Sequence, residues 1–116
     1  GLGHLQLVRE DHLAARRHLE RAVALDPSLA AAWSDLGLAS LMAGQTTAAS
    51  SAFGRALQLE PNLVTARYNR GLMRLHAGEL DAAEVDLAEA ARLAPENQDV
   101  ARALQELETL RRQEAE

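Results

Sequence analysis

The chain of 116 residues contains no cysteine and no lysine, and its only aromatic residues are Trp33, Phe53 and Tyr68. Without cysteine it can form neither disulfides nor thiolate metal sites, and its redox compartment stays undetermined. With so few aromatic side chains the core must consist of leucine and alanine, which favours close packing of helix on helix. No apolar run approaches the roughly eighteen residues that a membrane span requires.

Basic charge is also scarce, because 12 arginines face 17 carboxylates, for a formal net charge of -5. Binding to nucleic acid requires a concentrated basic face, whereas here arginine and glutamate alternate along the same segments. We therefore expect no nucleic-acid or membrane partner, and a basic or neutral protein partner is easier to accommodate. A cytoplasmic location is expected, while a signal or anchor preceding Gly1 stays open.

The three prolines are evenly spaced, because Pro27, Pro61 and Pro95 lie 34 residues apart. The residues around them repeat in the same register, and each proline follows a similar apolar helical ending. A fixed period of this length is typical of stacked supersecondary units.

Apolar periodicity between two prolines predicts a helical hairpin. Small and apolar residues recur at helical spacing from Trp33 to Ser40, Gly44 interrupts the pattern, and it resumes from Ala49 to Ala56. Two antiparallel helices joined at the glycine satisfy this pattern. Over the whole chain we expect helices near residues 2–9, 12–25, 29–43, 46–59, 63–77, 80–93 and 97–114.

The ordered residues of the middle unit carry a family resemblance: Trp33, Leu36, Gly37, Gly44, Ala49, Phe53, Ala56 and Pro61. Their order and period resemble the tetratricopeptide repeat. The resemblance implies an all-α fold, a right-handed α-solenoid of stacked antiparallel hairpins. It also implies a non-enzymatic scaffold or adaptor for protein–protein interaction that needs no cofactor.

The repeat period divides the chain into a single domain of four parts. We expect a truncated first repeat (1–27), two complete repeats (28–61 and 62–95) and a C-terminal capping helix (96–116). In the first repeat Glu10 occupies the position of Gly44 and Gly78. A truncated hairpin suggests that the chain belongs to a longer protein. Ser28, Asn62 and Asn97 are interpreted as helix caps.

The inner wall of such a solenoid is the candidate binding surface. By resemblance, a peptide or partner protein would bind in a concave groove lined by Ser34, Asp35, Leu38, Met42, Thr65, Tyr68, Asn69, Leu72, His76 and Arg102. Structural roles are assigned to Trp33, Gly37, Phe53, Pro61, Arg70, Asp86 and Pro95. Leu41 and Leu75 fit either the groove or the core between repeats.

Within that family, residues equivalent to Asp35 and Asn69 often hydrogen-bond a peptide backbone, which an amide can do as donor and acceptor. One subtype binds the C-terminal carboxylate of chaperone tails through Lys, Arg and Asn. Here Asp35 stands where that subtype has Asn, Thr65 where it has Lys, and Asn69 where it has Arg. Chaperone-tail recognition is therefore not expected.

Arg67, Arg70 and Arg74 share one helix face. They could form an anion site, but pairing of Arg70 with Asp86 is favoured, because a partly buried guanidinium needs a carboxylate. If Asp86 is buried, Arg70→Ala should destabilise the fold by about 3 kcal/mol or more.

Neither a catalytic group nor a metal site is indicated by the sequence. His12 and His18 are six residues apart and so lack the i, i+4 spacing of helical metal ligands. No serine or threonine can be matched with a general base that would activate its hydroxyl as a nucleophile. The alternative function is self-association through the truncated N-terminal repeat, over Leu2 to Val8, or support of an enzyme domain elsewhere in a longer protein.

Overall fold

The computed structural model describes the backbone of residues 2–115 and the side chains of residues 11–115. These residues are entirely helical apart from their turns. The helices, in chain order, are α1 (Leu2–Leu25), α2 (Ala30–Met42), α3 (Thr46–Leu59), α4 (Val64–His76), α5 (Leu80–Leu93) and α6 (Gln98–Ala115). The all-α fold of paired antiparallel helices is therefore confirmed.

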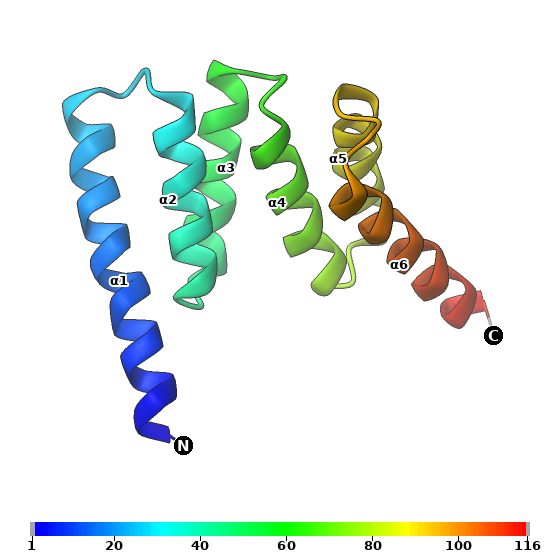
Figure 1. Ribbon diagram of the computed structural model, residues 1–116, viewed down its shortest axis with the longest axis horizontal. Coiled ribbons are helices and arrows are strands. Elements are labelled where there is room, and N and C mark those ends of the chain that lie inside the picture. The colour runs from blue at the N-terminus through cyan, green and yellow to red at the C-terminus, as the bar shows by residue number, and fades with distance from the viewer. Residues whose placement is uncertain (1, 116) are drawn as a thin grey trace. The chain divides into compact units, whose positions relative to one another are not determined.

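The chain divides into two compact units, Gly1–Leu63 and Val64–Glu116. In the first unit α2 packs against both α1 and α3, and neighbouring helices run antiparallel (Figure 1). In the second unit α5 packs against both α4 and α6, and α6 also touches α4 (Figure 1). Each unit therefore contains one complete hairpin and one additional helix.

The loops around the prolines repeat the same hydrogen bonds at the predicted period. The amides of Leu29, Leu63 and Asn97 donate to the carbonyls three residues earlier, at 3.3, 3.1 and 3.0 Å. Each proline lies inside the turn that this bond closes. Proline suits this place because it has a fixed φ and no amide hydrogen to satisfy.

The turns inside the two hairpins are also alike, and both depend on glycine. Gly44 and Gly78 each have a φ of +80°. The next amide, of Gln45 or Glu79, donates to the carbonyl five residues back, at 2.8 and 2.9 Å. This bond closes a left-handed helix cap that residues with a Cβ rarely adopt.

The expected turn near Glu10 is wrong, because α1 is continuous from Leu2 to Leu25. Glu10 occupies the register position at which the other hairpins place a glycine with positive φ. Glutamate resists that conformation and favours helix. The segment consequently forms one helix instead of two, which extends past the end of α2 (Figure 1).

Each hairpin is held together by a glycine that faces a large side chain. A Cβ on Gly37 would lie 2.6 Å from the Phe53 ring, and one on Gly71 would lie 2.8 Å from Leu87. Phe53 and Leu87 are both fully buried. The predicted structural role of Gly37 and Phe53 therefore corresponds to a contact that only glycine permits.

Trp33 lies near the start of α2, and Asn97 directly precedes α6. Trp33 packs against the cluster around Val23 and Leu36, and its Nε1 donates to the Pro27 carbonyl at 2.8 Å. Asn97 caps α6 as expected, since its Oδ1 accepts from the Asp99 and Val100 amides at 2.9 and 3.2 Å.

The cap prediction is wrong for Ser28 and stays untested for Asn62. The residue that precedes α2 is Leu29, which provides no side-chain cap. The Ser28 amide and hydroxyl instead donate to the Asp26 carboxylate, at 3.2 and 2.6 Å. These hydrogen bonds, the one from the hydroxyl above all, lower the pKa of Asp26.

Candidate functional site

In the second unit, one face of α4 lies opposite one face of α6. Tyr68 and Leu72 are partly buried against the core cluster that contains Leu75, Ala103 and Leu107. The pKa of Tyr68 is raised, first by its burial and then by the negative charge of Asp99. Tyr68 of α4 is therefore close to the start of α6.

The far end of the same face is polar and exposed. His76 Nε2 lies 3.7 Å from Glu106 Oε1, and these side chains are 65% and 50% exposed. Arg102 lies on α6 one turn before Glu106, and its Nη1 is 3.6 Å from Asp99 Oδ1 near the start of that helix. The predicted groove residues Tyr68, Leu72, His76 and Arg102 therefore flank the same α4–α6 face, which we call the α4–α6 groove.

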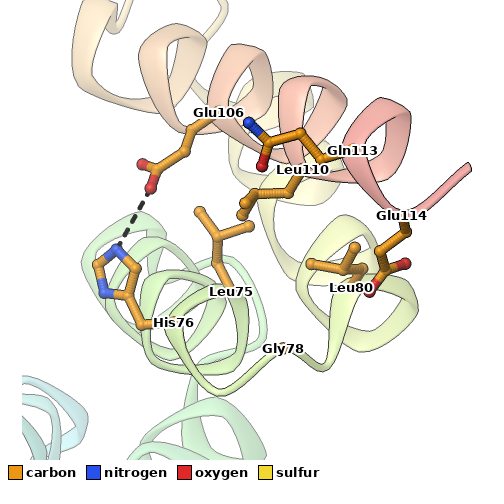
Figure 2. A pocket seen from close by; sticks show the side chains of 8 residues that line it. All are labelled: Leu75, His76, Gly78, Leu80, Glu106, Leu110, Gln113 and Glu114. Carbon is orange, nitrogen blue, oxygen red and sulfur yellow. Dashed lines mark ion pairs between the residues drawn. The ribbon is translucent and has the colours of Figure 1, made fainter. Parts of the chain in front are cut away.

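A pocket of about 500 Å³ adjoins the groove where α4 ends and α5 begins. Its lining residues are Leu75, His76, Gly78, Leu80, Glu106, Leu110, Gln113 and Glu114. Figure 2 shows the side chains of Leu75, Leu80 and Leu110 between the helices, while His76 and Glu106 face each other at one edge. The pocket thus has an apolar floor and a polar, mainly acidic rim.

Two further predicted groove residues lie on α4. Thr65 is exposed in the first turn of α4, and Asn69 is half-buried one turn later. Leu75, which the sequence left between groove and core, is 1% exposed and belongs to the core, although its side chain also lines the pocket.

In the first unit the corresponding residues lie on α2. Asp35 is exposed, and Leu38 and Met42 are 40% and 55% exposed, which is unusual for such apolar side chains. Ser34 is only 4% exposed and is therefore removed from the set of groove residues. The self-association surface expected over Leu2 to Val8 involves side chains outside those that the structure describes.

The basic face of α4 meets a single buried carboxylate. Asp86 is fully buried, and Arg70 donates to it twice, at 2.8 and 2.7 Å. Arg74 and Arg67 donate to the same carboxylate at 2.9 and 3.4 Å. The predicted pairing of Arg70 with Asp86 is confirmed, and Arg74 and Arg67 extend it.

Sequence reasoning did not assign Leu110, Gln113 and Glu114 to the site. Together with Glu106 they lie at i, i+4, i+7 and i+8, so they share a face of α6. That spacing is visible in the sequence, but it does not show that this face of the helix borders α4 and α5. The place of Leu80 at the pocket depends on how α5 packs, which no local pattern specifies.

Among the described side chains, no three histidine or acidic residues gather in a way that could hold a metal ion. Within residues 2–115, none of the helices has the length and apolar character needed to cross a membrane.

Comparison with solved structures gives the same fold. The first TPR of Spaghetti (RPAP3), bound to the HSP90 peptide SRMEEVD, matches with a TM-score of 0.77 and 16% identity, over 91% of each chain. The second TPR domain of human RPAP3, in complex with the HSP70 peptide SGPTIEEVD, matches with a TM-score of 0.77 and 20% identity, over 93% of this chain and 98% of that one.

At the level of sequence, the chain matches a family profile but no individual curated protein. No curated protein matches the chain significantly. The family profile described as tetratricopeptide repeat matches residues 1–62 and again residues 41–107. Together these matches cover most of the sequence and agree with the repeated turns and hairpins. The chain therefore belongs to the tetratricopeptide repeat family.

Proposed function

We propose that this chain is an adaptor module that binds a segment of a partner protein in the α4–α6 groove. One observation carries the proposal: Tyr68, Leu72 and His76 follow one face of α4, opposite Arg102 and Glu106 of α6. This face combines apolar area with exposed hydrogen-bonding groups, and such a mixture is typical of surfaces that bind peptides.

The chemistry of Asn69 and its neighbours suits a peptide backbone. The Asn69 amide offers two donors and an acceptor, so it can pair with a backbone amide and carbonyl whatever side chains the peptide carries. Thr65, one turn earlier on α4, is exposed and adds a hydroxyl. Leu72 and the Tyr68 ring would supply apolar contact beside these polar groups.

The solved relatives support a peptide as the type of partner. Both are described in complex with a short peptide, and their overall fold is that of this chain. At 16% and 20% identity they do not indicate which peptide sequence this groove prefers, and that preference follows from its own residues. We propose neither catalytic activity nor a cofactor for this chain.

Selection from a phage-displayed peptide library tests this function. We expect the wild-type chain to enrich a peptide family whose affinity falls about tenfold or more in Tyr68→Ala/Asn69→Ala, because hydrogen bonds and aromatic contact are both lost. Asn69→Ala alone, with circular dichroism of both variants, controls for folding. Enriched peptides that bind both folded variants as tightly as the wild type would contradict the proposal.

A further inference from the structure

We infer that the pocket beside the groove holds an apolar side chain of a cationic partner segment, one in which lysine or arginine flanks a leucine-like residue. This inference rests on the proposed function, because it specifies which peptides the α4–α6 groove selects. It is carried by the charge of the pocket rim, the apolar floor and the exposure of the rim carboxylates.

The floor of the pocket is suited to an aliphatic side chain. Leu75 and Leu80 are 1% and 7% exposed, and Leu110 is half-buried above them. The volume of about 500 Å³ lies within the range of about 300–1,000 Å³ that is common for ligand pockets. Filling this space removes apolar surface from water, which favours binding.

The rim selects the charge of the partner. Two carboxylates, Glu106 and Glu114, line the pocket, and His76 is its only basic lining residue. The imidazole is charged only when protonated, and it lies 3.7 Å from Glu106. Among the ion pairs between described residues, none involves Glu114. A cation beside these groups gains two attractive contacts, whereas an acidic segment meets repulsion.

The helix ends do not reverse this preference. The C-terminal end of α4, at His76, carries partial negative charge, while the N-terminal end of α5, at Leu80, carries partial positive charge of similar size. Both ends border the pocket, so their effects approximately cancel. Arg102 of the groove does not line the pocket and lies 3.6 Å from the Asp99 carboxylate. Among the residues that line the pocket, the carboxylates of Glu106 and Glu114 therefore decide the sign of the local field.

This preference distinguishes the chain from its structural neighbours. The peptides named for those structures, SRMEEVD and SGPTIEEVD, both end in Glu-Glu-Val-Asp and so carry three acidic side chains near their C-terminus. Peptides with that charge would bring carboxylates towards Glu106 and Glu114. The same fold would therefore be used here for a partner of opposite charge.

The test is a fluorescence anisotropy titration with three labelled synthetic peptides. The first has lysines flanking one central leucine, the second replaces the lysines by glutamates, and the third replaces the leucine by serine. We expect the wild-type chain to bind the first peptide at least tenfold more tightly than either of the others. Affinity should fall as salt rises, because exposed charges are screened.

Variants of the rim locate the effect. Glu106→Gln/Glu114→Gln should weaken binding of the lysine peptide by about threefold to tenfold, since each exposed charge pair is individually weak. Glu106→Lys/Glu114→Lys should abolish it. The control Glu96→Gln/Glu108→Gln changes net charge by the same amount at exposed positions outside the pocket, and should bind within twofold of the wild type.

Three results would overturn the inference. The first is equal or tighter binding of the glutamate peptide, and the second is an equal loss of affinity in the rim and control variants. The third is light scattering that reveals dimers which the lysine rim variant dissociates, because the occupant would then be a second copy of this chain. If library peptides still depend on Tyr68 and Asn69, the proposed function stands although its cationic preference fails.

Discussion

At the scale of single residues, the two complete repeats pack the same face with different chemistry. In the first unit Leu36 and Ala52 belong to an apolar cluster. One period later the same positions are Arg70 and Asp86, which form two hydrogen bonds. The choice between leucine and arginine can be read from sequence, but the convergence of Arg67 and Arg74 on the same carboxylate depends on side-chain conformation.

The three arginines change the expected effect of substituting Arg70. Because Asp86 keeps Arg74 at 2.9 Å and Arg67 at 3.4 Å, Arg70→Ala should lower the free energy of unfolding by about 2 kcal/mol, less than a fully stranded carboxylate would. Arg70→Ala/Arg74→Ala should lower it by about 3 kcal/mol or more. Urea denaturation measures both changes.

A matched control replaces the cluster by the residues of the preceding repeat. Arg67→Trp/Arg70→Leu/Arg74→Ser/Asp86→Ala removes every charge together, so no carboxylate is left buried without a partner. We expect this variant to be more stable than Arg70→Ala/Arg74→Ala, because an apolar replacement of a buried ion pair is often neutral. The opposite order would refute the structural role of the cluster.

Two helical glycines should respond to alanine in opposite directions. Gly71→Ala places a Cβ 2.8 Å from Leu87, which is fully buried, so the free energy of unfolding should fall by about 1–3 kcal/mol. Around Gly54 a Cβ meets nothing within 4 Å, so Gly54→Ala should stabilise by up to about 1 kcal/mol. Thermal denaturation distinguishes them; destabilisation by Gly54→Ala would contradict the geometry.

At the scale of helices, the period predicted the helices from residue 29 onwards, and α1 is the exception. The proline and glycine signals are local, so the turns at Gly44 and Gly78 follow directly from the sequence. The apolar pattern of α1 permits either one helix or two, and Glu10 decides in favour of one. The pocket was not predicted, since it depends on how α6 packs against α4 and α5.

Substitutions of Gly78 test the role of the hairpin turn between α4 and α5. Gly78→Ala should lower the free energy of unfolding by about 1–2 kcal/mol, because an L-residue is strained at a φ of +80°. Gly78→Asn should cost less, since asparagine tolerates the left-handed region. Differential scanning calorimetry of the two variants checks the order, and equal melting temperatures for Gly78→Ala and the wild type would show that the turn carries no strain.

At the scale of the whole molecule, each unit contains its own spectroscopic probe. Trp33 lies in the first unit and Tyr68, the single tyrosine, in the second. In repeat proteins the free energy of unfolding is close to a sum of contributions from each unit and each interface. A substitution in one unit can therefore destabilise that unit more than the other. Arg70→Ala should therefore shift the tyrosine absorbance transition to lower urea more than the Trp33 fluorescence transition. Equal shifts would indicate a single cooperative unit.

The α4–α6 groove is tested most directly by nuclear magnetic resonance of the labelled chain titrated with the lysine–leucine peptide. We predict that backbone amide shifts concentrate at Tyr68, Asn69, His76 and Glu106 and along the pocket residues of α6. Shifts concentrated instead at Glu84 and Glu108, which line a separate pocket between α5 and α6, would contradict binding in the groove.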